Sequence, residues 1–153
     1  MFYDLALKFD PASRRCDLVI GDDGDLVIDE TSVTPMMMSI GLDRRADEDD
    51  PLPEGRTEFL TPPSFSIMRG CAGDALDLAG RRTGSKLWLL DRAKATEQTR
   101  LFCEFWLKEA LEWVKTDIGS PPEITVTWAD EKTLKYRVQI DAVSISKNVL
   151  VGA

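Results

Sequence analysis

The sequence predicts an α+β fold in which helices pack on antiparallel strands. Three observations favour this class: apolar and polar residues alternate with period two near both ends, the middle has helical periodicity, and 153 residues suit one domain. We therefore expect a single domain over residues 1–153. It should contain an N-terminal β-meander, two or three central helices and a C-terminal antiparallel β-hairpin.

The first thirty residues have the pattern of short strands separated by turns. Apolar residues alternate with more polar ones over 5–9, and residues 10–13 have turn chemistry. Two further strands, over 16–20 and 26–28, flank a Gly-Asp-Asp-Gly turn, which is a strong hairpin signal. The turn is not followed by the glutamate that an EF-hand calcium loop needs, so we interpret it as a solvated hairpin turn.

The period changes after residue 33. Thr34 and Pro35 are typical of an N-cap and a first helical position, and they predict a helix from Pro35 to about Ala46. Arg44 and Arg45 would then lie in its last turn, where cations suit the helix dipole.

Two more helices are expected in the second half of the chain. Ser85 as an N-cap predicts a short helix over 86–92, and Thr96 as an N-cap predicts the longest helix, about 97–116. Aromatic residues of the long helix fall on one broad stripe. A helix this aromatic is either central to the core or covered on a second side by a partner.

An irregular loop is expected over about 47–72. It begins with the acidic run at 47–50, continues with four prolines, and is longer than the usual limit of about 12–15 residues. Such a segment is either functional or mobile. We interpret the acidic run as a solvated loop rather than a divalent-metal patch.

The C-terminal third contains the clearest strand pattern. Apolar residues alternate with polar ones over 124–128 and again over 134–140, with a turn between them. This predicts a two-stranded antiparallel hairpin with one buried, apolar face and one solvent-exposed, polar face. The tail could extend the last strand or trail free, and we expect it to be flexible over about 146–153.

Composition argues against several classes of chemistry. The chain has 27 acidic and 19 basic side chains, a formal charge of −8 and no histidine. Histidine-dependent nucleophilic catalysis is therefore excluded, the commonest zinc ligand is missing, and direct nucleic-acid binding is disfavoured. Three scattered cysteines form neither a disulfide framework nor a metal motif. We expect no catalytic residues, no cofactor and no metal, and neither a signal peptide nor a membrane span.

Two stretches carry a family resemblance. The first is Leu-Asp-Arg-Arg-Ala-Asp-Glu-Asp-Asp-Pro-Leu-Pro-Glu-Gly at 42–55. The second is Arg-Gly-Cys-Ala-Gly-Asp-Ala at 69–75, followed by Gly-Ser-Lys-Leu-Trp-Leu-Leu at 84–90. In this order and spacing they resemble the Mu-like phage and prophage tail protein family, small baseplate wedge proteins similar to the sheath initiator of contractile-tailed phages. The opening strands resemble that family's N-terminal meander.

The resemblance implies a non-catalytic structural virion protein of the bacteriophage tail. Its implied partners are other baseplate wedge proteins and the tail sheath protein, with several copies in each assembled baseplate. Its implied location is the virion tail, and the host bacterial cytoplasm during virion assembly. The chain departs from the family at Cys71 and Ala72, where two tryptophans are usual, and residues 56–68 match nothing in the family pattern.

Several residues are candidates for partner binding. An exposed hairpin edge can accept a strand from a neighbouring chain, tryptophans of the helices can pack on wedge partners, and basic residues can pair with acidic surfaces. For the two arginines, a local ion pair with Asp47 or Asp49 is slightly favoured over a partner contact. The candidates are Arg44, Arg45, Trp88, Trp106, Trp113, Lys135, Arg137 and Gln139.

Two other functions are compatible with the same sequence. A free binding module or chaperone of tail assembly would have the same fold but be absent from purified particles. A carboxylate-based, lysozyme-like hydrolase is less favoured, because no acid/base pair can be identified in the sequence.

Overall fold

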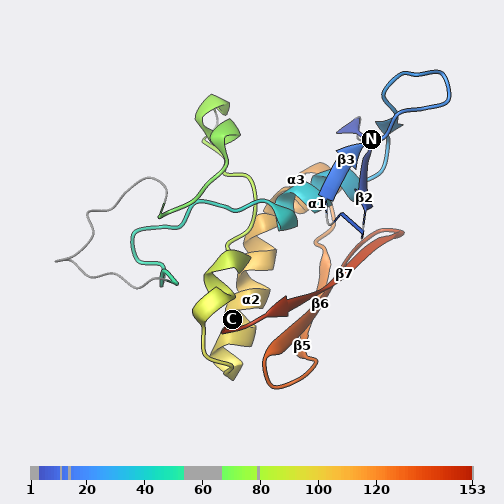
Figure 1. Ribbon diagram of the computed structural model, residues 1–153. Helices are drawn as coiled ribbons and strands as arrows, with labels where there is room; N and C mark the ends of the chain where they lie inside the picture. The colour runs from blue at the N-terminus through green and yellow to red at the C-terminus, as the bar shows by residue number, and fades with distance from the viewer. Residues whose placement is uncertain (1–3, 11, 14, 54–66, 79, 153) are drawn as a thin grey trace.

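The computed structural model has the expected α+β architecture (Figure 1). It describes residues 4–10, 12–13, 15–53, 67–78 and 80–152. Short N-terminal strands come first, helices occupy the middle, and a three-stranded antiparallel sheet ends the chain. Within the described ranges, no helix combines the length and apolar character needed to cross a membrane.

Short strands form in the N-terminal region, as predicted, and they pair as two separate two-stranded sheets. Strand β1 (Asp4–Leu5) pairs with β4 (Ile28–Asp29), and β2 (Leu7–Asp10) pairs with β3 (Arg15–Leu18). An isolated bridge joins Ile20 to Leu26 around the acidic turn. We call residues 4–29 the N-terminal arm. Figure 1 shows it in blue at one end of the molecule.

Helix α1 (Val33–Gly41) is shorter than predicted. The expected end near Ala46 is wrong because the backbone after Gly41 leaves the helix to pair with a distant segment. Leu42 is extended and accepts a hydrogen bond from the Ser85 backbone N–H. The predicted N-cap is also wrong: Thr34 lies inside the helix, where its hydroxyl bonds the Leu5 carbonyl oxygen and ties α1 to β1.

The long helix begins as predicted and is interrupted near its end. The Thr96 side chain accepts a hydrogen bond from the Thr99 N–H, which confirms the N-cap of α2 (Glu97–Ala110). A break at Leu111 separates α2 from α3 (Glu112–Asp117).

Among the described residues, two short 3₁₀ helices precede α2. One is η1 (Ala72–Leu76), and the other is η2 (Leu87–Arg92), which replaces the short α-helix predicted over 86–92. Ser85 is not its N-cap, because the Ser85 hydroxyl donates to the Ile40 carbonyl oxygen at 2.8 Å. Of the predicted irregular loop over 47–72, residues 54–66 lie outside the described residues, and residues 47–53 contain no helix or strand.

The predicted C-terminal hairpin is confirmed and extended by a third strand. Strand β5 (Glu123–Trp128) pairs with β6 (Thr133–Ile140), and β6 pairs along its whole length with β7 (Val143–Leu150). The flexible tail predicted over 146–153 is therefore wrong for residues 146–150, which belong to β7. Asp141, with φ of +50°, turns the chain between β6 and β7.

The core lies where α2, η2 and one face of the C-terminal sheet meet (Figure 1). Alternate residues of β6 point into this core and are buried, as predicted for the apolar face of the hairpin. Fully buried side chains include Met36, Leu90, Leu107, Leu111, Val114, Leu134, Tyr136, Val138 and Val151.

Candidate functional site

The two sequence motifs that carry the family resemblance lie against each other. Asp43 and Ser85 form a parallel β-bridge, in which the Arg44 N–H donates to the Ser85 carbonyl oxygen at 2.9 Å. Gly84 makes this approach possible: it has φ of +96°, and a Cβ there would lie 2.4 Å from the Leu42 carbonyl oxygen. No other residue type fits that position without moving the backbone.

Lys86 is the centre of an ion-pair cluster that links the two motifs. Its side chain is 4% exposed, and its Nζ lies 2.6 Å from Asp47, 2.8 Å from Asp50 and 3.8 Å from Glu109. Burial alone would lower the pKa of Lys86, but the bonds from Asp47 and Asp50 outweigh it and raise the pKa. The ammonium therefore stays charged and joins the acidic loop to the start of η2 and to α2.

Trp88 adds a second fastening beside this cluster. Its indole N–H donates to the Arg44 carbonyl oxygen at 2.9 Å, and the Arg69 guanidinium lies 4.5 Å from the ring centre. Arg69 also pairs with Asp43 at 2.8 Å and with Asp91 at 3.6 Å. The residues of the motifs therefore form contacts within the chain. We name this set the motif clamp, made of Asp43, Arg44, Asp47, Asp50, Arg69, Ser85, Lys86 and Trp88.

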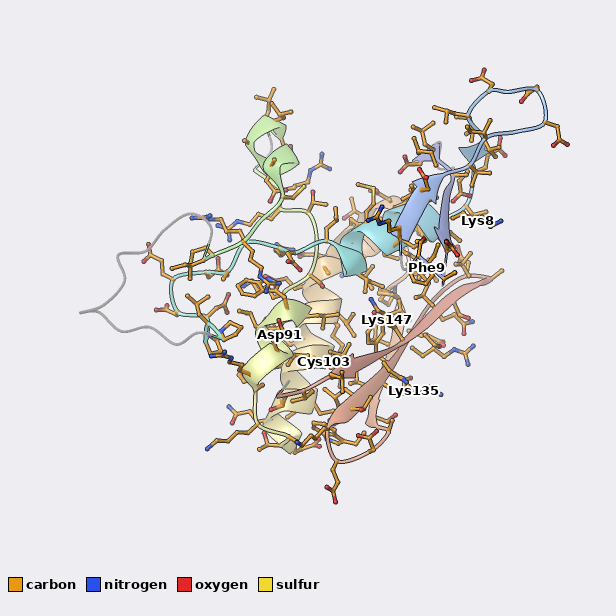
Figure 2. All side chains as sticks on the ribbon, viewed as in Figure 1. Lys8, Phe9, Asp91, Cys103, Lys135 and Lys147 are labelled. Atoms are coloured by element: carbon orange, nitrogen blue, oxygen red, sulfur yellow. The ribbon has the colours of Figure 1, made fainter. Side chains whose placement is uncertain are left out.

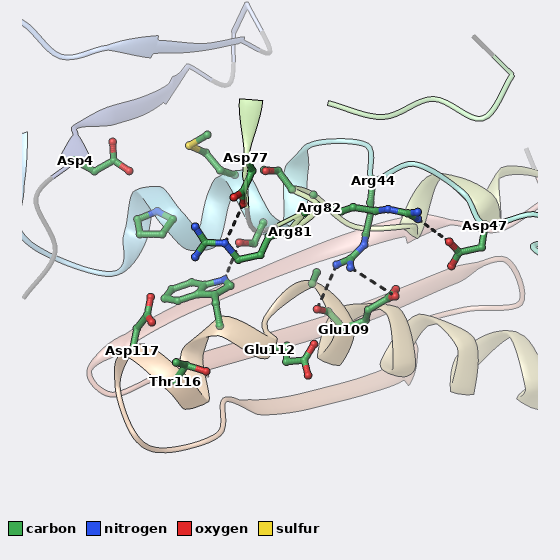
Figure 3. A pocket seen from close by; sticks show the side chains of 18 residues that line it. Asp4, Arg44, Asp47, Asp77, Arg81, Arg82, Glu109, Glu112, Thr116 and Asp117 are labelled. Atoms are coloured by element: carbon green, nitrogen blue, oxygen red, sulfur yellow. Dashed lines mark hydrogen bonds and ion pairs between the residues drawn. The ribbon is translucent and has the colours of Figure 1, made fainter. Parts of the chain in front are cut away.

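A cleft of about 760 Å³ borders the motif clamp (Figure 3). Its three arginines each lie against a carboxylate: Arg44 against Glu109 at 3.8 Å, Arg81 against Asp77 at 2.9 Å and Arg82 against Asp47 at 2.6 Å. Arg44 thus pairs across to Glu109 of α2, whereas the local alternative predicted a pair with Asp47 or Asp49.

Asp47, on the wall of the cleft, does not have the properties of a general acid. A general acid needs a raised pKa, whereas hydrogen bonds from Lys86 and then Arg82 lower the pKa of Asp47. Across the described part of the chain, acidic and cysteine side chains form no group that could hold a metal ion. Burial raises the pKa of the Cys103 thiol to about 12, which disfavours the nucleophilic thiolate form.

The open face of the C-terminal sheet is a more suitable surface for partners. Lys135 and Arg137 point away from the core side of β6 and are exposed, with Gln139 half-buried next to them. Across the pairing register they lie opposite Asn148, Ser146 and Ser144 of β7. Figure 2 shows Lys135 on this sheet.

The outer edge of β7 carries an unpaired row of backbone groups. The two-residue turn at 141–142 makes Ile140 and Val143 a hydrogen-bonded pair, so the alternate residues of β7 direct their N–H and C=O groups outward. Arg100 supports this alternation, because its guanidinium reaches the outward carbonyl oxygen of Val126 on β5 at 3.3 Å. No comparable contact from the described residues reaches the outward groups of β7, which belong to Ser144, Ser146, Asn148 and Leu150.

The structure separates the predicted partner-binding residues into two groups. Trp88 and Trp106 belong to the core, and Trp113 is half-buried with its indole N–H on the Ser39 hydroxyl. Arg44 and Arg45 face other parts of the chain, Arg45 through the Arg69 carbonyl oxygen. Of these candidates, Lys135, Arg137 and Gln139 lie on an open surface, and their binding to a partner stays a prediction.

The sequence reasoning missed two features: the edge of β7 and the exposure of the N-terminal arm. The alternation of small polar residues with Ile145 and Val149 was a usable signal for a third strand. The exposure of the arm has no such signal, because alternation shows which face is apolar but not what covers it.

Comparison with known proteins identifies relatives among phages. The sequence profile of the family described as "Phage protein GP46" matches residues 32–147. The chain is also similar to the baseplate protein gp46 of Escherichia phage Mu, with 39% identity over 98 residues. That alignment covers 63% of this chain and 60% of the Mu protein, so the chain spans less than two thirds of its relative. No solved structure matches this chain significantly.

Proposed function

The chain belongs to the phage protein GP46 family, and we propose that it is a structural baseplate component of a contractile tail that templates sheath assembly. The observation that carries the baseplate role is the similarity to the baseplate protein of phage Mu. In this proposal the chain is located in the virion tail and contacts other wedge proteins and the sheath protein. It performs no catalysis.

The edge of β7 is the part of the molecule best suited to act as the template. An incoming extended segment can pair with the outward backbone groups of β7 and add a fourth strand to the sheet. Such pairing depends on backbone hydrogen bonds, and it orients the added chain in a fixed register. Lys135 and Arg137 lie on the adjoining open face, where they can contact acidic side chains of the added segment.

A single substitution tests the strand-template role. Ser146→Pro removes one outward N–H and places a ring on the edge, while the core side of the sheet is unchanged because Ser146 is exposed. We expect about tenfold fewer sheathed tails, counted by electron microscopy, because a blocked ladder loses several hydrogen bonds of roughly 1 kcal/mol each. Naked tail tubes should accumulate.

Ser146→Ala is the matched control, because it keeps the outward N–H and should assemble sheath normally. Circular dichroism of both purified variants establishes that each is folded. Normal sheath formation with Ser146→Pro would contradict the strand-template role.

The chaperone alternative is tested separately by mass spectrometry of purified particles. A baseplate component is present in them in several copies, whereas an assembly chaperone is absent. Absence of the chain would contradict the baseplate role whatever the result for Ser146→Pro.

A further inference from the structure

The β2–β3 ribbon of the N-terminal arm has two chemically different faces. In its register Leu7 lies opposite Leu18 and Phe9 opposite Cys16, so these four side chains share one face. Alternation along the strand adds Ile20, which bridges to Leu26. The other face pairs Lys8 with Asp17 and Asp10 with Arg15. We call the first the apolar arm face, made of Leu7, Phe9, Cys16, Leu18, Ile20 and Leu26.

The described part of the chain leaves the apolar arm face open. Phe9 is 53% exposed and Ile20 is 68% exposed, and Leu18 and Leu26 are exposed as well. In Figure 2 Lys8 and Phe9 extend from β2 in different directions, as their places on opposite faces require. A two-stranded ribbon with an uncovered apolar face is marginally stable in water, and contiguous exposed apolar side chains mark interaction sites.

The charge of the arm decides what kind of surface would cover this face. Residues 4–31 contain eight acidic and three basic side chains. Asp22, Asp23 and Asp25 form the turn directly beyond the Ile20–Leu26 bridge. Two copies of the chain stacked through this face would bring like charges together, which disfavours self-association. A partner with apolar side chains rimmed by lysine or arginine has the complementary chemistry.

We propose that the apolar arm face docks a segment of a different protein whose apolar side chains are rimmed by lysine and arginine. Different strands form this surface and the outer edge of β7, so a chain that failed to template sheath through β7 could still bind through the arm. Burial of Phe9, Leu18 and Ile20 would supply the affinity, and the acidic turn would orient the basic rim.

Cys16 provides a native reporter, because it is exposed on the apolar arm face whereas Cys103 is buried. In a Cys71→Ser background, we would measure maleimide labelling of Cys16 in the purified chain and in the complex formed in cells that produce all the tail proteins. We expect labelling to slow by about tenfold or more in the complex, because the buried centre of an interface excludes the reagent. Equal labelling in both samples would overturn the proposal.

A matched reporter on the opposite face provides the control. Lys8→Cys, in a background where Cys16 and Cys71 are both serine, places a thiol on the charged face of the same strand. It should stay reactive in the complex. Equal protection at both positions would overturn a docking site confined to the apolar face.

Photocrosslinking then identifies the occupant. Benzoylphenylalanine in place of Phe9, introduced in the same cells, should crosslink a peptide of another protein that carries lysine or arginine beside apolar residues. A crosslink to a second copy of this chain, or to an acidic segment, would overturn the proposal. Ile20→Asp should abolish the crosslink without changing the thermal unfolding of the free chain, since Ile20 lies outside the core.

Discussion

The N-terminal arm and the C-terminal sheet are both antiparallel and both alternate in sequence, yet the described residues cover the apolar face of the sheet and not that of the arm. On β6 the apolar positions Leu134, Tyr136 and Val138 are buried under α2 and η2. On the arm, Phe9 and Leu18 occupy equivalent alternating positions and are exposed. The difference shows that period-two alternation defines which face is apolar, whereas burial depends on an element elsewhere in the chain, or in another chain.

The largest expected effect is on unfolding after truncation of matched leucines in the two regions. Leu134→Ala removes a fully buried side chain from β6 and should lower the free energy of unfolding by about 2–5 kcal/mol. Leu18→Ala removes an exposed side chain from β3 and should change it by less than about 0.5 kcal/mol. Urea denaturation followed by tryptophan fluorescence measures both values.

The slope of unfolding free energy against urea concentration provides a control, because it reports how much surface the chain exposes on unfolding. Both variants should keep the wild-type dependence of unfolding free energy on urea, because neither changes the surface exposed when the body of the protein, its described residues after the arm, unfolds. A loss of about 2 kcal/mol or more for Leu18→Ala would mean that the arm is part of the cooperative core, and the comparison would fail.

The fold was largely predictable because its strongest signals are local. Alternation over 124–128 and 134–140 indicated β5 and β6, and Thr96 indicated the start of α2. The end of α1 was not predictable from local pattern, since Leu42 leaves the helix to pair with Ser85, 43 positions further along the chain. Tertiary pairing overrides helix propensity in such places.

The candidate site was less predictable than the fold. The motif clamp uses residues that looked suitable for partners, such as Arg44 and Trp88, for contacts inside the chain. A sequence does not show whether an arginine or tryptophan faces inward, because the answer depends on elements more than forty residues away. The exposure of Lys135 and Arg137 was predictable, because strand alternation alone places them on the solvent-facing side of the sheet.

Buried charge should distinguish the motif clamp from the open sheet face in the same way as apolar contacts distinguish the sheet from the arm. Lys86→Met leaves Asp50 and Glu109 without their shared cation and should destabilise the chain by about 3 kcal/mol, near the low end for a buried pair because Asp47 is half exposed. Lys135→Met on the open sheet face is the matched control and should change stability by less than about 0.5 kcal/mol. Equal effects in thermal unfolding would show that the motif clamp does not stabilise the fold.

The smallest expected effect concerns acid, and it compares two carboxyl groups whose pKa is lowered in the folded chain. For Asp47 the cause is Lys86 and then Arg82, whereas for Asp10 it is the hydrogen bonds of Ser13 and Ala12 in the arm. A lowered pKa stabilises the fold above the unfolded pKa of about 4, and this stabilisation is lost as the pH falls through the folded pKa.

Asp47→Asn should therefore reduce the loss of unfolding free energy between about pH 5 and pH 3, by less than about 1 kcal/mol because the carboxylate is half exposed. Asp10→Asn should leave this pH dependence of global unfolding unchanged, because the arm contributes little to the core that unfolds cooperatively. The urea midpoints of both variants and of the wild-type chain, measured across this pH range, give the two pH dependences. If Asp10→Asn flattened the curve as much as Asp47→Asn, the arm and the body would unfold as one unit.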